Sequence, residues 1–213
     1  GVSYAGHGLP NIDELGVDIY MFSLYKVYGP HLGVMFMRKA VNEKLPNQGH
    51  FFNTNYPTAR FTPAGPDHAQ IASVNGVIDY FEAVYAHHFD EDEVPASLKT
   101  SRVRALFQHT ERRNLKPLLS FLSHRQGVHL VGKDVTKHRA PTVSFTVEGR
   151  DPADIAAALA SQKIGIANGN CYAYRLMQAL DIPPDTGVAR LSFVHYTNRE
   201  EIDRLVEALD QAL

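Results

Sequence analysis

The N-terminal half of the chain carries two short apolar runs, residues 17–22 and 34–37, on either side of a polar, glycine-containing loop. Short apolar runs bounded by turn residues are typical of strands with both faces buried. The loop between them, residues 23–33, contains Lys26, Gly29 and Gly33. We therefore expect two buried strands joined by a loop that carries a lysine.

Further along, apolar residues return at near-helical spacing, which predicts helices. These helices are expected over residues 67–88, 97–124, 151–161, 174–180 and 200–213. Pro117 predicts a kink or a break in the longest of them, and Asn198 is the expected N-cap of the last. Apolar and β-branched runs predict strands over residues 128–131, 142–147, 164–167 and 188–194.

The acidic stretch at residues 89–95, which ends in Pro95, is the expected domain boundary. It divides the chain into residues 1–95 and residues 96–213. The second part interleaves strands with helices, which predicts a small α+β domain.

Composition narrows the classes of function. The chain has 213 residues, of which 44% are hydrophobic and 21% charged, and a formal net charge of −2. It has no basic stripe, so we expect no nucleic-acid partner, and no apolar run of about 18 residues, so we expect no membrane span. One cysteine excludes an internal disulfide framework and indicates a reducing, cytoplasmic location. The adjacent His87 and His88 do not share a helix face, and no metal site is predicted.

Lys26 needs a chemical reason if its flanking strands are buried, because an unpaired buried ammonium is costly. A desolvated lysine is more readily held as the neutral amine, which can form a Schiff base with a carbonyl cofactor. Ser23, three residues earlier, offers a hydroxyl to an anion beside that amine. Gly29 and Gly33 allow sharp turns and a close approach of the backbone to a ligand.

These residues form one motif, Asp18-x-x-x-x-Ser23-x-x-Lys26-x-x-Gly29-Pro30-x-x-Gly33. It resembles the cofactor-lysine segment of class V aminotransferases, fold-type-I enzymes that use pyridoxal 5'-phosphate and include the cysteine desulfurases. The resemblance implies that Lys26 binds the cofactor covalently and that Ser23 contacts its phosphate. Tyr25 occupies the position of a phosphate-contacting histidine in the desulfurases. Ser3 lies where many members place a side chain that touches the cofactor's phenolic oxygen.

The same resemblance implies an α/β fold. Residues 1–95 would be a remnant of the large-domain mixed sheet, and residues 96–213 the C-terminal α+β small domain. The family aspartate that pairs with the pyridinium nitrogen would lie directly before Gly1, so we expect the chain to be the C-terminal part of a longer, homodimeric protein. The loop at residues 60–66 resembles the family loop that reaches the partner subunit's cofactor phosphate. Pro66 replaces the usual threonine there, and Arg60 is a candidate substrate contact or part of an ordinary surface loop.

Arg190 lies in the run Gly187-Val188-Ala189-Arg190-Leu191-Ser192-Phe193, with apolar neighbours on both sides. An inward guanidinium needs an anion, and arginine matches a carboxylate with two parallel hydrogen bonds. The resemblance implies that Arg190 binds the carboxylate of an amino-acid substrate. The alternative is a structural salt bridge to an aspartate or glutamate.

The segment at residues 165–173 contains Asn168, a second candidate substrate contact, and Cys171. Desulfurases carry their persulfide-forming cysteine in this region. The segment is more similar, however, to a desulfurase-like branch that has an aromatic residue at the position of Cys171. A free cysteine is also commonly a small buried hydrophobe.

Together these features predict a pyridoxal-phosphate-dependent transferase or lyase that acts on an amino-acid-like small molecule. Two alternatives stay open: a true cysteine desulfurase that uses Cys171, and a truncated product without catalytic activity.

Overall fold

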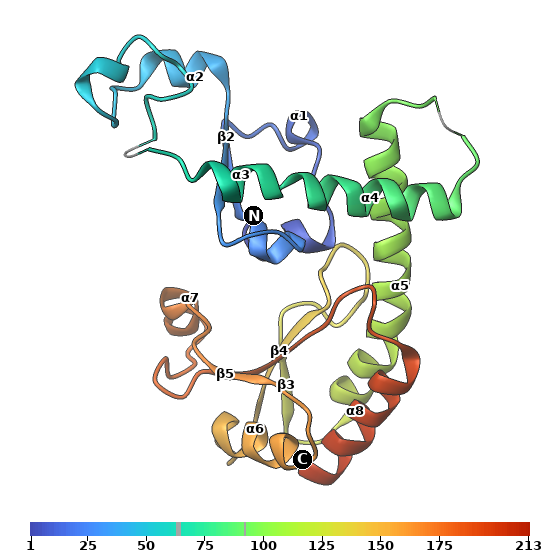
Figure 1. The fold of residues 1–213 in the computed structure, drawn as a ribbon. Helices are drawn as coiled ribbons and strands as arrows, with labels where there is room; N and C mark the ends of the chain where they lie inside the picture. The colour runs from blue at the N-terminus through green and yellow to red at the C-terminus, as the bar shows by residue number, and fades with distance from the viewer. Residues whose placement is uncertain (63–64, 92) are drawn as a thin grey trace. The chain divides into compact units, whose positions relative to one another are not determined.

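The computed structural model describes residues 1–62, 65–91 and 93–213. The chain divides into two compact units, Gly1–Ala105 and Leu106–Leu213, and Figure 1 traces the elements of both. Pro63 and Ala64, in the loop predicted to reach a partner subunit, lie outside the described residues, as does Asp92 in the acidic stretch. The predicted division at residues 95 and 96 stays a prediction.

The first unit is built around a β-hairpin. Its elements are η1 (Ala5–His7), α1 (Ile12–Leu15), β1 (Ile19–Ser23), η2 (Leu24–Val27), β2 (Gly33–Met37), α2 (Lys39–Lys44), η3 (Phe51–Asn53), α3 (His68–Ser73), α4 (Asn75–His88) and the start of α5 (Ala96–His124). β1 pairs antiparallel with β2, from Ile19 opposite Met37 to Ser23 opposite Gly33. The predicted strand–loop–strand is confirmed.

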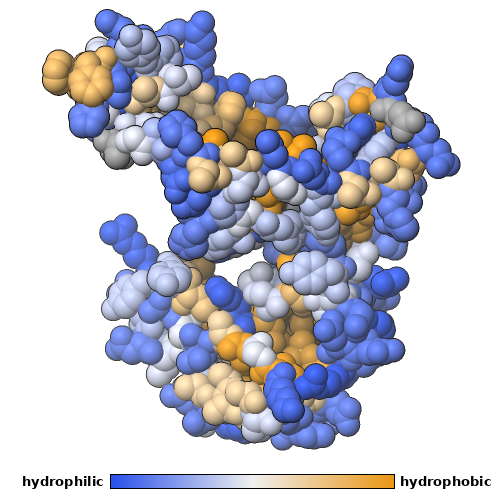
Figure 2. Space-filling view, in the orientation of Figure 1, coloured by the Kyte–Doolittle hydropathy of each residue, from blue (hydrophilic) through white to orange (hydrophobic). Residues whose placement is uncertain are grey.

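The predicted burial of these strands is wrong. Met21 on β1 is 57% exposed and Met35 on β2 is 43% exposed. The hairpin forms a two-stranded sheet among the described residues, and of its apolar side chains Phe22 packs against the buried cluster of Ala5, Val27 and Val77. Apolar side chains are visible at the surface of this unit in Figure 2.

The helix predicted over residues 67–88 is confirmed in outline but interrupted, because α3 ends at Ser73 and α4 begins at Asn75. Asp67 caps α3 by accepting a hydrogen bond from the backbone N–H of Gln70. α4 also supports the lysine loop. A Cβ on Gly29 would lie 3.0 Å from Val77 Cγ2 and 3.1 Å from the Leu24 carbonyl oxygen, so glycine allows this close packing.

The second unit is a four-stranded antiparallel sheet with helices packed on one face. Its elements are β3 (Val128–Val131), β4 (Thr142–Val147), α6 (Pro152–Ser161), β5 (Ala167–Gly169), α7 (Tyr174–Ala179), β6 (Val188–Ser192) and α8 (Arg199–Ala212). The strand order is β3-β4-β6-β5. The core joins residues of α5, α6 and α8 to one face of the sheet, including Leu118, Phe145, Ile155 and Leu209.

Apolar and polar side chains alternate along β4, and this alternation gives the sheet one apolar and one polar face. Val143 and Phe145 on β4 are fully buried, whereas Thr142, Ser144 and Thr146 between and beside them are partly exposed. Successive side chains of a strand point to opposite faces. The open face of the sheet is therefore polar along β4.

One local prediction for this unit is wrong, and a second is decided in part. The strand predicted at 164–167 is displaced, because only Ala167–Gly169 pairs with β6. Ile164 and Ile166, which precede this strand, pack against the core instead of pairing. Of the kink or break predicted at Pro117, the break does not occur, because α5 continues from Ala96 to His124. The remaining predicted strands and helices are confirmed within one or two residues.

The last helix has the predicted cap. Asn198 accepts a hydrogen bond from Glu201 N–H, and Glu201 in turn accepts one from the backbone N–H of Asn198. Asn114 of α5 donates from Nδ2 to the Thr197 carbonyl oxygen at 2.6 Å, which attaches this turn to α5.

Over the described part of the chain, no helix is both long enough and apolar enough to span a bilayer.

Candidate functional site

Lys26 lies on the short helical turn η2, directly after β1. Its side chain is exposed, so the burial on which the argument from a desolvated lysine depended is not present in the described residues. Within the described residues no ion pair or hydrogen bond occupies its amine. Ser23 precedes the turn with a hydroxyl that makes no capping hydrogen bond. An amine and a hydroxyl thus stand three residues apart without a competing partner.

The N-terminal segment packs against the lysine loop. Tyr28 Oη donates to the Gly6 carbonyl oxygen at 3.0 Å, and a Cβ on Gly6 would overlap the Lys26 carbonyl oxygen. Ser3 is exposed in the turn that precedes this contact. The structure therefore brings the segment that contains Ser3 beside the backbone of Lys26.

Tyr25 is held in place by an aromatic partner. Its ring stacks on the imidazole of His31, with centroids 4.5 Å apart and planes inclined by 10°. Tyr25 is nevertheless 46% exposed. The stacked pair comes from the two ends of the loop and limits the movement of Tyr25 beside Lys26.

Arg60 has local backbone partners. Its Nη1 donates to the Asn42 carbonyl oxygen at 2.7 Å, and its Nη2 donates to the Leu45 carbonyl oxygen. Both acceptors lie at the end of α2, so Arg60 attaches the following loop to that helix. Its predicted contact with the substrate stays a prediction.

Arg190 lies on β6 in the middle of the second unit's sheet. It is in register with Ser144 of β4 on one side and Ala167 of β5 on the other. Its chain neighbours, Ala189 and Leu191, are buried in the core, so Arg190 points to the open face. The Arg190 side chain is half-buried, and its Nε atom is buried without a hydrogen-bond acceptor.

No carboxylate forms an ion pair with Arg190 among residues 1–62, 65–91 and 93–213. The structural salt bridge considered above is therefore not formed within these residues. A buried guanidinium N–H without an acceptor is energetically unfavourable. This cation has the environment expected of an anion site.

Asn168 and Cys171 do not share the Arg190 position. Asn168 is in register with Ala189, so its side chain projects to the sheet face opposite that of Arg190. Cys171 is partly buried, and its thiol donates to the Gly169 carbonyl oxygen at 3.6 Å. Cys171 and Tyr172 both have positive φ, at 50° and 64°, which forms the tight tip of this loop.

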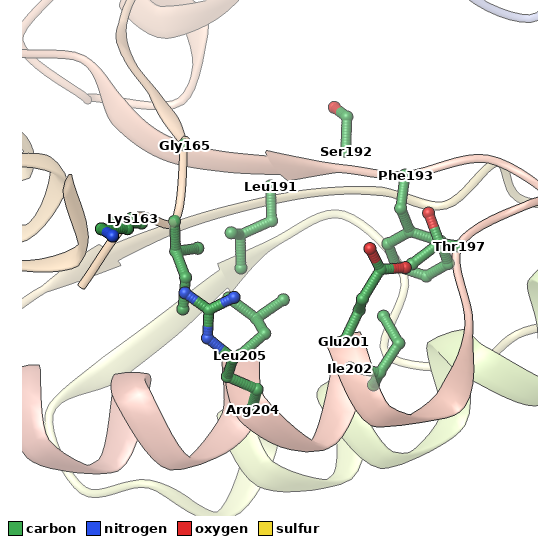
Figure 3. Close-up of a pocket in the computed structure, with 11 residues that line it drawn as sticks. Lys163, Gly165, Leu191, Ser192, Phe193, Thr197, Glu201, Ile202, Arg204 and Leu205 are labelled. Atoms are coloured by element: carbon green, nitrogen blue, oxygen red, sulfur yellow. The ribbon is translucent and has the colours of Figure 1, made fainter.

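The second unit also has a pocket of about 220 Å³ between residues 163–165, the end of β6 and α8. Figure 3 shows Glu201 and Arg204 rising from α8 toward the strand that carries Leu191. None of the predicted site residues lines it. Glu201 already caps α8, and Arg204 donates from Nη2 to the Gln162 carbonyl oxygen, so both have structural partners.

The described residues contain no group of three or more histidine, cysteine, aspartate or glutamate side chains placed to hold a metal ion. The chemistry-bearing side chains are an amine, hydroxyls, a phenol and a guanidinium. This set suits an organic cofactor with a carbonyl and a phosphate, together with a carboxylate ligand.

The fold is that of fold-type-I pyridoxal-phosphate enzymes. A cysteine desulfurase from Thermococcus onnurineus NA1 matches 99% of this chain and 50% of its own, with a TM-score of 0.77 and 23% identity. A cysteine desulfurase from Escherichia coli matches 100% and 50%, with a TM-score of 0.73 and 21% identity. The predicted fold class is confirmed.

Residues 1–205 match the family described as Aminotransferase class-V, and the chain belongs to this family of pyridoxal-phosphate enzymes. An aminotransferase-like protein of Gibberella zeae is 32% identical over 218 residues, covering 100% of this chain and 50% of the relative. A probable cysteine desulfurase of Pseudomonas putida is 30% identical over 219 residues, covering 97% and 48%. The chain spans about half the length of the curated relatives it matches.

Proposed function

We propose that the protein containing this chain is a pyridoxal-phosphate-dependent transferase or lyase that acts on an amino-acid substrate. Arg190 carries the proposal. Its guanidinium is half-buried on the open sheet face, its Nε has no acceptor, and no carboxylate pairs with it in the described residues. A substrate carboxylate would satisfy this cation with charge-assisted hydrogen bonds.

The residues of the lysine loop fit the cofactor. Pyridoxal 5'-phosphate, when bound, supplies an electron sink for the bond broken at the substrate α-carbon. Lys26 Nζ, which is exposed and without an ionic partner, would bind the cofactor covalently and later take the α-proton as a general base. Ser23 and Tyr25 would donate hydrogen bonds to the phosphate, and Ser3 to the phenolic oxygen.

The packing of the loop supports this assignment. Tyr28, Gly6 and Gly29 hold η2 through one hydrogen bond and two close backbone approaches. A lysine used in catalysis has to be presented at a defined position, because small displacements of a reacting group are costly in rate. The predicted substrate contacts of Asn168 and Arg60 are not used in this proposal, because Asn168 projects to the other sheet face and Arg60 donates to backbone carbonyls.

A true cysteine desulfurase is the second candidate, favoured by the names of relatives such as the probable desulfurase of Pseudomonas putida. That activity would need Cys171 as the nucleophile that takes up the substrate's sulfur. The Cys171 thiol is partly buried and contacts the Gly169 carbonyl oxygen. We therefore assign the main reaction to Lys26 and Arg190 without a thiol step.

Two wider features belong to the same proposal: a homodimer in the complete protein and a reducing, cytoplasmic location, the latter inferred from a single cysteine. Light scattering on the complete protein would give the oligomeric state. A monomer with full activity would contradict the dimer.

Arg190 provides the test of function. In the complete protein, Arg190→Ala should raise the KM for the amino acid while the cofactor's visible absorbance stays unchanged, because Arg190 contacts the substrate and not the cofactor. Arg190→Lys keeps the charge but loses the two parallel N–H donors of the planar guanidinium. It should therefore still lower kcat/KM, by an amount equivalent to roughly 1.5–3 kcal/mol.

The result that would overturn this function is a purely structural effect. If Arg190→Ala lowered the free energy of unfolding by several kcal/mol while substrate saturation stayed unchanged, Arg190 would not bind substrate. The amino-acid substrate class would then lose its main support.

A further inference from the structure

The buried Nε–H of Arg190 needs an acceptor, and the sheet offers a particular candidate. A guanidinium has five N–H donors and no acceptor, and its Nε–H lies nearest to the strand. On the open face, Arg190 is flanked in register by Ser144 and Ala167. Ala167 has no polar side-chain atom. Of the two residues in register with Arg190, Ser144 is therefore the one with a polar side chain.

The strand register brings these two side chains within reach of each other. Residues directly opposite each other in an antiparallel pair have Cβ atoms about 4.5–5.5 Å apart on the same face. A serine hydroxyl moves among three staggered positions about χ1. One rotation can thus turn Ser144 Oγ toward the Nε of Arg190, with no change in the backbone.

The other hydroxyls of this face have different neighbours. Ser192 donates to Thr142 Oγ1 at 3.4 Å, and Thr146 is in register with His129 of β3. Ser144 makes no hydrogen bond through its side chain within the described residues. Its hydroxyl is therefore available to accept a hydrogen bond from Arg190.

We propose that Ser144 is a positioning residue for Arg190: its Oγ accepts the Nε–H, so that the two Nη groups together hold the substrate carboxylate. This inference rests on the proposed function. An arginine can bind a carboxylate through Nε and one Nη or through both Nη groups, and an acceptor on Nε selects the second geometry. The carboxylate is then fixed in orientation as well as attracted.

The test uses the complete, cofactor-loaded protein and two probes, L-alanine and ethylamine, which is alanine without its carboxylate. Binding is followed by the change in cofactor absorbance. Ser144→Ala should weaken the apparent affinity for L-alanine about five- to tenfold, equivalent to ~1–1.4 kcal/mol for one lost hydrogen bond. The affinity for ethylamine should not change.

The matched control is Thr146→Ala, which removes a hydroxyl from the same face of the same strand at a position in register with His129 instead of Arg190. It should leave both affinities unchanged. Ser144→Thr and Ser144→Val provide a second comparison, because both are β-branched and only threonine keeps the hydroxyl. The threonine variant should bind L-alanine more tightly than the valine variant by a similar factor.

The inference is overturned if Ser144→Ala weakens L-alanine no more than Thr146→Ala does, or if it weakens both probes equally. Equal affinity of the threonine and valine variants would also overturn it. In each case the proposed function survives if Arg190→Ala still weakens L-alanine selectively. If Arg190→Ala has no selective effect either, the proposed function fails as well.

Discussion

The two units bury their apolar residues to very different extents. In the second unit, Leu118, Phe145 and Ile155 belong to one continuous core in which they are fully buried. In the first unit, the buried cluster around the lysine loop consists of Ala5, Val27 and Val77. Large apolar side chains of that unit remain exposed instead, among them Ile19, Met21, Met35, Phe36 and Phe51.

This difference separates two ways of presenting a functional side chain. Arg190 lies on a strand whose alternate residues are buried in a core, and buried apolar area stabilises at about 25 cal/mol per Å². Lys26 lies on an open hairpin, held by Tyr28, Gly6 and Gly29. The packed unit holds its cation through the core of the fold, whereas the open unit holds its amine through a few local contacts.

The largest expected effect is a loss of turnover on substitution of Lys26 in the first unit, without a matching loss of stability. Lys26→Ala should lower turnover of the complete protein by at least ~10²–10⁴-fold, the usual contribution of a general base. In the cofactor-free protein, its free energy of unfolding should change by less than about 0.5 kcal/mol, as for an exposed residue. Lys39→Ala, which removes an exposed lysine of α2, is the control and should retain activity.

Borohydride reduction followed by peptide mapping would locate the covalent attachment directly. We expect the label on the peptide that contains Lys26. A label on any other lysine would show that the lysine loop has been assigned the wrong role.

The second prediction compares core with hairpin. Phe145→Ala should cost about 3–5 kcal/mol of stability, because it leaves a cavity in a closed core. Met21→Ala, at a side chain that is 57% exposed, should cost less than about 1 kcal/mol. Urea unfolding of the chain of residues 1–213 measures both, and similar losses would mean that β1 is covered in solution.

The third prediction compares the asparagine caps of the two units. Asn198→Ala removes the capping box of the 14-residue α8 and should cost about 1 kcal/mol. Asn11→Ala removes the cap of the four-residue α1, which has no buried residue, and should cost less than Asn198→Ala. Thermal unfolding of the two variants under one buffer condition gives the ranking, and the reverse order would contradict the comparison.

The smallest expected effect belongs to Cys171. Cys171→Ala should keep turnover on the protein's own amino-acid substrate within about tenfold, or ~1.4 kcal/mol. The reason is that the hydrogen bond of the thiol in the described structure goes to the Gly169 carbonyl oxygen. Complete loss of sulfide release from L-cysteine in this variant would instead establish the desulfurase.

Local signals were sufficient for much of this protein. Pro152 at the start of α6 and Asn198 before α8 mark helix starts where the structure has them, because caps and first-turn residues act within three or four positions. Apolar and β-branched runs located β4 and β6, because such runs are also read within a few neighbouring positions. The spacing of Ser23, Lys26 and Gly29 was enough to identify the family, since that motif lies within one loop.

Only the tertiary structure decided burial, register and side-chain partners. The exposure of Met21 and Lys26, the displacement of β5 to Ala167–Gly169, and the position of Ser144 opposite Arg190 each depend on residues distant in the sequence. An apolar strand has the same pattern whether or not another layer covers it, and the register of two strands is determined by the packing of the whole sheet. Such long-range choices are made by the folded chain as a unit, so no local pattern contains them.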